Sequence, residues 1–279
     1  MLLSANNRTL DLSQVQIMGI LNVTPDSFSD SGQFLRLDDA LYHAEAMLTQ
    51  GASIIDIGGE STRPGAADVS VDEELARVIP LVEAVRSRFD CWISVDTSKA
   101  QVMREAAKAG MDIINDVRAL QEDGALQSAV ALDLPVCLMH MQGQPRTMQQ
   151  CPHYDDVVQE VCEYLAQRAQ ICINAGVRAE HIILDPGFGF GKTTEHNYQL
   201  LQQLDKLCKL GYPILAGLSR KSMIGNVLKN DVDDRDLGSA VATLLTVMKG
   251  ARILRVHNVK AMAQALKIWQ VTQNPALVK

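Results

Sequence analysis

The sequence predicts a single α/β domain, a (β/α)8 barrel (TIM barrel) that spans residues 1–279. Short apolar runs alternate with helical patterns in the order strand then helix, and this alternation implies a parallel sheet. Eight such units in roughly 260 residues suit a closed barrel. No low-complexity linker divides the chain. An open doubly wound sheet is the competing arrangement.

Eight strands are predicted from short apolar runs that end at a polar residue or at a turn. They comprise residues 15–21, 53–59, 91–95, 113–114, 135–139, 182–184, 213–217 and 252–256. Residues 1–14 precede them and are of mixed polarity, so a short strand or hairpin is expected there.

The helices are predicted from apolar residues at helical spacing and from residues suited to their ends. Ser70 with Glu73 and Ser98 with Gln101 fit capping boxes, and Asn258 fits the N-cap of the last helix. The predicted helices cover residues 38–51, 70–85, 98–110, 124–133, 154–174, 200–207, 237–248 and 258–269.

Composition and charge exclude several classes of protein. The chain is 47% hydrophobic and 21% charged, as is ordinary for a globular protein, and its net charge of −7 argues against nucleic-acid binding. The N-terminus lacks the pattern of a secretory signal, and no apolar run approaches the ~18 residues of a membrane span. The six cysteines form no C-x-x-C pair, so buried reduced thiols in a cytoplasmic protein are expected.

Polar side chains gather where the predicted strands end. In a barrel the carboxyl ends of all strands meet at one face, and active sites lie there. The residues at these ends are Asn22, Asp56, Asp96, Asn115, His140, Asp185, Ser219 and His257. The loops beyond them add Phe28, Ser61, Thr62, Arg63, Phe190, Arg220, Lys221 and Ser222. Arg255 lies two residues before His257, so both side chains can point into the barrel.

These side chains fall into three chemical groups. The first is cationic and suits a polyanion, the second offers donors and acceptors to a flat heterocycle, and the third offers apolar surfaces. In that order the groups are Arg63, Lys221, Arg255 and His257; Asp96, Asn115 and Asp185; and Phe28, Pro64 and Phe190. Residues 219–222 also begin a short helix whose first N–H groups attract anions. The pocket therefore suits a planar polar ring, a phosphate-like group and an aromatic second partner.

Structural roles remain open for several of these residues. Asn22 could complete a turn, Asp96 could cap a helix, and Asp185 could belong only to its Pro-Gly turn. His140 is interpreted as a core histidine. Arg255 is the hardest to explain structurally, because a charge inside a barrel strand is costly to bury without a partner.

The glycine-rich segment 182–193 runs from a strand through Asp185 to Lys192 and Thr193. It nearly fits the phosphate-binding pattern G-x-x-x-x-G-K-[ST], but Pro186 occupies the first glycine position. Proline lacks the necessary flexibility, and the preceding carboxylate would repel phosphate. The sequence therefore argues against nucleoside triphosphate binding, and the glycines instead let the backbone approach a ligand beside Asp185.

Longer motifs resemble those of the bacterial dihydropteroate synthases, which are pterin-binding barrel enzymes. They are residues 19–28 (GILNVTPDSF), 56–65 (DIGGESTRPG), 185–190 (DPGFGF) and 219–222 (SRKS). Residues 94–97 (SVDT) and 255–257 (RVH) also agree with the family. The resemblance covers nearly the whole chain in the right order.

The resemblance implies a transferase of folate biosynthesis. Such enzymes condense 6-hydroxymethyl-7,8-dihydropterin pyrophosphate with p-aminobenzoate to give 7,8-dihydropteroate, by departure of pyrophosphate and attack of the aniline amine. The family is cytoplasmic, uses Mg²⁺, is the target of sulfonamides and forms homodimers, and no nucleic-acid or membrane partner is implied.

The resemblance also implies a role for each site residue. The pterin is assigned to Asp96, Asn115, Asp185 and Lys221. The pyrophosphate is assigned to Asn22, Ser61, Arg63, Arg255 and His257, with Mg²⁺ on Asn22. The p-aminobenzoate is assigned to Phe28, Thr62, Pro64, Phe190 and Ser222. The residues expected to be catalytic are Asp96, Asp185, Lys221, Arg255 and His257.

Two other functions remain possible from the residues. A pterin-binding methyltransferase barrel would bind the same ring but would not need residues 61–65 or 219–222. A non-catalytic pterin-binding protein would need the carboxylates and Asn115, but not Arg63, Arg255 and His257 together. The presence of all these residues favours the synthase.

Overall fold

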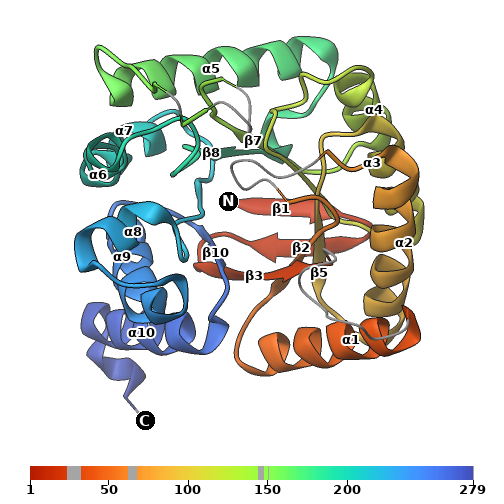
Figure 1. Ribbon diagram of the computed structural model, residues 1–279, viewed down its shortest axis with the longest axis horizontal. Helices are drawn as coiled ribbons and strands as arrows, with labels where there is room; N and C mark the ends of the chain where they lie inside the picture. The colour runs from red at the N-terminus through yellow and green to blue at the C-terminus, as the bar shows by residue number, and fades with distance from the viewer. Residues whose placement is uncertain (24–32, 62–67, 144–147, 150, 279) are drawn as a thin grey trace.

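The computed structural model describes residues 1–23, 33–61, 68–143, 148–149 and 151–278. In these residues eight parallel strands form one sheet with helices packed around it, as predicted (Figure 1). The strands are β3 (Gln16–Asn22), β4 (Ile54–Gly58), β5 (Trp92–Asp96), β6 (Ile113–Asp116), β7 (Val136–Met139), β8 (Ile182–Asp185), β9 (Leu215–Ala216) and β10 (Ile253–Val256).

The strand order is β8-β7-β6-β5-β4-β3-β10-β9. The sheet closes between its two outermost strands through a parallel bridge from Leu184 to Ile214. There the Leu184 N–H donates to the Pro213 carbonyl at 3.0 Å. This closure distinguishes the barrel from the open doubly wound alternative.

The helices that surround the barrel follow the strands in sequence. They are α1 (Gln33–Thr49), α2 (Val71–Arg88), α3 (Ala100–Ala109), α4 (Ala125–Leu132), α5 (Val157–Ala175), α6 (Thr194–Gln202), α7 (Leu204–Cys208), α8 (Ser222–Leu228), α9 (Asp236–Met248) and α10 (Val259–Gln273). The described part of the chain also forms the short 3-10 helices η2 (Ala179–His181), η3 (Val232–Arg235) and η4 (Pro275–Leu277). None of the helices in the described ranges is long and apolar enough to cross a membrane.

The helix ends show which local predictions were right. The capping box of Ser70 with Glu73 is present at the start of α2, and Asn258 caps α10. The predicted capping box at Ser98 is wrong, because its hydroxyl donates to the Asp116 carboxylate and α3 begins without a side-chain cap. The helix predicted over residues 200–207 is divided into α6 and α7. Helix α1 begins five residues earlier than predicted, and α5 begins three residues later.

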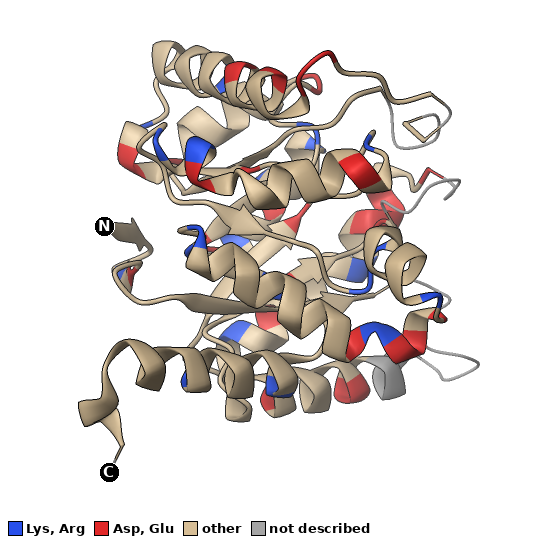
Figure 2. Ribbon diagram, turned by 90° about the vertical axis from the view of Figure 1, so that its left-hand side faces the viewer, with Lys and Arg blue, Asp and Glu red and all other residues tan. Residues whose placement is uncertain are grey.

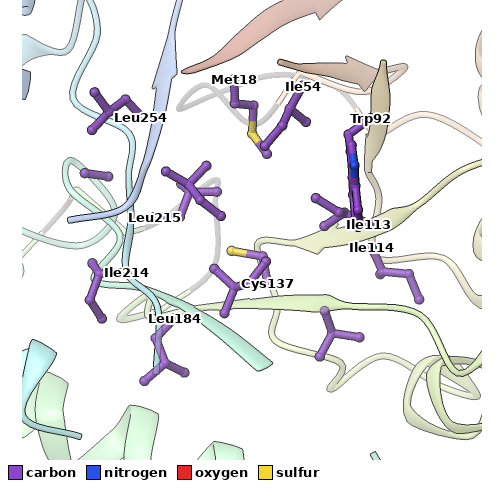
Figure 3. Packing of buried hydrophobic residues seen from close by; sticks show 14 of the residues in the cluster. Met18, Ile54, Trp92, Ile113, Ile114, Cys137, Leu184, Ile214, Leu215 and Leu254 are labelled. Carbon is purple, nitrogen blue, oxygen red and sulfur yellow. The ribbon is translucent and has the colours of Figure 1, made fainter. Parts of the chain in front are cut away.

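The barrel interior is filled by apolar side chains from neighbouring strands (Figure 3). Met18 on β3 pairs in register with Ile54 on β4, which pairs with Trp92 on β5. Because side chains alternate along each strand, every second residue from this layer also points inward. The next layers toward the carboxyl ends therefore bring the polar residues of the strand tips into the barrel.

The N-terminal hairpin predicted from residues 1–14 is present as β1 (Leu2–Ala5) and β2 (Arg8–Asp11), which pair antiparallel. It covers the end of the barrel at which the strands begin, since Asn6 Nδ2 donates to the Met111 carbonyl at 2.8 Å. Figure 2 shows both chain termini at this end of the molecule. All six cysteines are free thiols, as expected.

Helix α9 presents apolar side chains to solvent. Four of the residues from which it is predicted are exposed, and we call them the α9 face: Leu237, Val241, Leu245 and Met248. Its buried side is made of small residues, Ser239, Ala240, Ala242, Thr243, Thr246 and Val247. The small side allows close packing against the barrel, and Leu237 remains 78% exposed.

Candidate functional site

The register of the sheet places the predicted site residues next to one another at the carboxyl ends of the strands. Asn22 on β3 pairs with Gly58 on β4, Gly58 with Asp96 on β5, and Asp96 with Asn115 on β6. On the next two strands, Met139 on β7 pairs with Asp185 on β8. Four residues that are far apart in sequence thus line one rim of the barrel.

Arg255 lies at the centre of this rim. Its Nε donates to Asp56 Oδ2 at 2.7 Å and its Nη2 donates to Asp96 Oδ2 at 2.9 Å. The guanidinium is 20% exposed, whereas Asp56 is fully buried. One cation therefore holds two carboxylates from two strands, which answers the question of how a charge inside a barrel strand is tolerated.

Asp56 organises two further side chains. The Ser94 hydroxyl donates to Asp56 Oδ1 at 2.5 Å, and Asn115 Nδ2 lies 3.3 and 3.4 Å from the two Asp56 oxygens. The two Asp56 oxygens thus fix the Asn115 amide with its NH2 group toward Asp56. The carbonyl oxygen of Asn115 then points away from Asp56 and can accept a hydrogen bond from a ligand.

Burial shifts the pKa values of three charged groups at the rim. Burial raises the pKa of Asp96 to about 7, against the opposing effect of Arg255 and with help from the nearby Asp56. Burial also raises the pKa of Asp185, and it lowers the pKa of Lys221 to about 8. Shifts of this kind in a cluster at the strand ends are typical of a functional site.

Asp185 begins the glycine-rich segment, and the backbone of that segment approaches its side chain closely. The Gly187 N–H donates to Asp185 Oδ1 at 2.7 Å. Gly187 has a φ of 66°, and a Cβ there would lie 1.9 Å from the His140 carbonyl oxygen. Only glycine can occupy this position without displacing the backbone of the neighbouring segment.

Lys221 reaches the same segment from the start of α8. Its Nζ donates to the Phe188 carbonyl and lies 4.3 Å from the centre of the Phe190 ring. Phe190 itself is buried against Val117, Met139 and Met148. The glycine-rich segment thus brings Lys221, which is assigned to the pterin, next to Phe190, which is assigned to p-aminobenzoate.

The remaining cationic candidates separate into two environments. His257 is held by Ser219, whose Oγ lies 3.0 Å from His257 Nδ1. Arg220 is one of the loop residues predicted to lie beyond the strand ends. It instead forms a bidentate ion pair with Asp236, at 2.7 and 3.0 Å. Ser222 is the exposed first residue of α8. Arg220 is therefore a structural residue of the α8–α9 region.

Several predicted site residues cannot be placed in the rim. Phe28, Thr62, Arg63 and Pro64 lie outside the described residues. Ser61 is the last described residue before that segment and is partly buried. The described rim accordingly contains the assigned pterin ligands and part of the assigned pyrophosphate ligands.

Two site features were missed by reasoning from the sequence. Asp56 lies among the predicted strand ends but has no role in the sequence-based assignments, because its pairing with Arg255 depends on the register of the whole sheet. Lys192 was considered only as a phosphate ligand, and it is buried beneath the glycine-rich segment, beside His140. Burial lowers the pKa of His140 to about 2, which agrees with its interpretation as a core histidine.

Comparison with known protein families shows which proteins this chain resembles. A family described as "Pterin binding enzyme" matches residues 18–257. The chain is 65% identical over 274 residues to the dihydropteroate synthase of Haemophilus influenzae, with coverage of 98% of this chain and 100% of that protein. It is 54% identical over 272 residues to the dihydropteroate synthase of Escherichia coli K12, with coverage of 98% and 96%.

Solved structures of dihydropteroate synthases also resemble the chain. The Yersinia pestis dihydropteroate synthase, solved in a sulfonamide drug complex, has a TM-score of 0.94 at 54% identity, and 98% of this chain and 99% of that chain are covered. The Xanthomonas albilineans dihydropteroate synthase in complex with 7,8-dihydropteroate has a TM-score of 0.90 at 45% identity, with coverage of 98% and 99%.

Proposed function

The chain belongs to the pterin-binding enzymes and, within them, to the dihydropteroate synthases, and on this premise we propose how its residues divide the reaction. It is a transferase of folate biosynthesis, which joins 6-hydroxymethyl-7,8-dihydropterin pyrophosphate to p-aminobenzoate. The observation that carries the assignment of roles is the rim in which Arg255 joins Asp56 to Asp96 beside Asn115.

We assign the pterin ring to Asp96, Asn115, Asp185 and Lys221. A pterin carries ring N–H and amino donors at one edge and a carbonyl at another, which suits carboxylate acceptors and an ammonium donor. Buried carboxylates also stabilise positive charge on the ring as the bond to pyrophosphate breaks. The raised pKa of Asp96 means that burial disfavours its ionised form. A hydrogen-bond donor of the ligand would compensate part of this cost.

The pyrophosphate is assigned to Asn22, Ser61, Arg63, Arg255 and His257. These groups would stabilise the negative charge that develops on the leaving group. The contacts of Arg255 add a second role, because it also neutralises Asp56 and Asp96. Replacement of Arg255 should therefore weaken binding of the pterin ring as well as of its pyrophosphate.

Mg²⁺ fits the rim at Asn22. Mg²⁺ in phosphate-transfer sites keeps several waters and takes one or two protein oxygens together with phosphate oxygens. A Cβ on Gly58 would lie 3.0 Å from Asn22 Oδ1, so the glycine leaves space at that oxygen. The ion would neutralise charge on the departing pyrophosphate.

The p-aminobenzoate is assigned to Phe28, Thr62, Pro64, Phe190 and Ser222. An aniline amine is already neutral at pH 7, so its attack needs no strong general base. The enzyme has to place the amine next to the pterin methylene carbon as pyrophosphate leaves. Since the Yersinia pestis relative was solved with a sulfonamide drug, sulfonamides are expected to compete with p-aminobenzoate here.

We further propose a cytoplasmic homodimer that forms through the α9 face. Its four exposed apolar residues recur along one side of the helix, and the exposed Leu228 on α8 lies beside Gly238 of α9. A contiguous exposed apolar patch marks an interaction surface, and a twofold dimer buries the same patch on both copies. Val241→Asp should give a monomer by light scattering after gel filtration, and Ile171→Asp on α5 is the matched control. A dimeric Val241→Asp protein would exclude this face.

One assay tests the function directly. The protein is mixed with Mg²⁺, the pterin pyrophosphate and p-aminobenzoate, and both pyrophosphate and dihydropteroate are measured. We expect release of pyrophosphate that depends on p-aminobenzoate, in a one-to-one ratio with dihydropteroate. Calorimetric titration of pyrophosphate with and without Mg²⁺ tests the metal separately, since equal affinity in both would exclude a bridging ion. Release that does not depend on p-aminobenzoate would overturn the proposed reaction.

A further inference from the structure

Lys192 belongs to the glycine-rich segment, but none of the roles proposed above uses it. Its side chain is buried, with 3% of the residue exposed. Nζ lies 2.9 Å from the Gly187 carbonyl oxygen, 3.0 Å from the Phe190 carbonyl oxygen and 2.9 Å from His140 Nδ1. The His140 carbonyl oxygen lies 3.4 Å from Nζ as a fourth acceptor, and burial lowers the pKa of Lys192 well below its usual value.

The partners of Lys192 explain why it is buried there. Burial keeps His140 neutral near pH 7, so Nδ1 can accept a hydrogen bond. The two carbonyl groups come from either end of the turn that carries Phe188, Gly189 and Phe190. Removing the lysine would leave these buried acceptors without their donor, which is costly.

The opposite side of the same turn faces the substrate site. The Phe188 carbonyl accepts a hydrogen bond from Lys221, and the Phe190 ring lies beneath the Lys221 ammonium. Glycine geometry fixes the path of the turn, because a Cβ on Gly191 would lie 2.4 Å from the Gln142 carbonyl oxygen. Lys192 therefore holds the turn from within, while the site uses its outer surface.

We propose that Lys192 is a positioning residue, which fixes the turn at residues 187–190 so that Phe190 can form the p-aminobenzoate site. The inference rests on the role proposed for Phe190. Lys192 is buried and acts through the turn. The pterin ligands Asp96 and Asn115 come from strands outside the turn, whereas Asp185 and Lys221 are hydrogen-bonded to it. Loss of the turn should therefore affect p-aminobenzoate, which depends on Phe190, more strongly than the pterin.

The test is a double-mutant cycle of Lys192→Met and Phe190→Ala, with Lys206→Met on α7 as the control for loss of a lysine. Methionine has a similar length and no donor. Since buried carbonyl groups lose their hydrogen-bond donor, we expect Lys192→Met to raise the KM for p-aminobenzoate about tenfold. The Kd for the pyrophosphate-free pterin, measured by calorimetry, should change less than about threefold, and Lys206→Met should change neither.

The cycle separates positioning from general damage. If Lys192 acts through Phe190, adding Lys192→Met to Phe190→Ala should raise this KM by much less than tenfold. Full additivity, an unchanged KM in Lys192→Met, or equal losses for both substrates would overturn the proposal. If Lys192→Met does not fold, the same double-mutant cycle is measured with Lys192→Gln, which keeps a shorter hydrogen-bond donor.

Phe190→Ala by itself tests the premise. An unchanged KM for p-aminobenzoate in that variant would refute the role proposed for Phe190. A raised KM in Phe190→Ala together with a normal KM in Lys192→Met would refute only the role of Lys192.

Discussion

The two ends of the barrel treat buried carboxylates in opposite ways. At the end where the strands begin, Asp112 is fully buried and accepts from Arg86, from the Ile93 N–H at 2.9 Å and from Asn6 at 3.0 Å. At the end where they finish, Asp96 accepts within the described ranges from one side chain, Arg255. Burial raises the pKa of Asp96 to about 7.

The difference shows which carboxylates serve the fold and which await a ligand. A carboxylate can accept about four hydrogen bonds, and the chain itself supplies most of those around Asp112. Around Asp96 much of this capacity is left, and its burial is compensated only in part. In barrel enzymes the end where strands begin contributes stability and the other end contributes activity. Substitutions at the two ends should therefore separate the two properties.

The largest effect is expected from Asp112→Ala. It leaves the partly buried Arg86 without its fully buried carboxylate partner, and breaking a buried ion pair usually costs about 3–5 kcal/mol of stability. Chemical denaturation measures this loss. The kcat of the protein that remains folded should be normal, because Asp112 lies at the far end of the barrel. Unchanged stability, or a tenfold lower kcat in fully folded protein, would contradict the division between the ends.

The converse variant is Asp185→Asn at the carboxyl ends. The loss of one charged contact to the transition state should lower kcat/KM by ~10²–10³. Stability should change little, because burial already opposes the charge of Asp185 and asparagine has the same shape. Steady-state kinetics and a denaturation curve measure both quantities. Near-normal turnover would remove Asp185 from the pterin site.

The active end was predictable because its residues follow a local rule. A polar residue lies at or near the carboxyl end of each strand, and closure of the barrel brings these ends together, so Asn22, Asp96, Asn115 and Asp185 could be grouped from the sequence alone. Asp56 obeys the same rule, yet its role depends on Arg255, which lies 199 residues away. Long-range pairs of this kind require the register of the whole sheet.

The outer surface was less predictable for a related reason. A helical stripe of apolar residues usually faces the core. In α9 the stripe is exposed, and small residues such as Thr243 and Thr246 face inward. The choice between the two sides is made by the space between neighbouring helices. The capping box at Ser98 failed similarly, since the distant Asp116 accepts the hydroxyl that local sequence assigned to the helix.

The smallest expected effect is the pH dependence of pterin affinity and of stability, both of which depend on Asp96. Asp96 must be ionised to accept from the pterin, so with a pKa of about 7 the affinity should fall about tenfold from pH 8 to pH 6. The pyrophosphate-free pterin is the suitable ligand for calorimetry, because pyrophosphate itself titrates. Asp96→Asn should remove this part of the pH dependence.

Stability should respond to Asp96 with the opposite sign. Its pKa in the folded protein lies above its value of 3.8 in an unfolded chain, so the folded state binds the proton more tightly. The contribution of Asp96 to stability is thus complete below pH 3.8 and is lost as pH rises through 7. Comparison of the wild type with Asp96→Asn by denaturation at pH 6 and pH 8 isolates this contribution. If acidification strengthened pterin binding, or if Asp96→Asn destabilised the protein more at pH 8 than at pH 6, Asp96 would resemble Asp112, and the contrast between the ends would fail.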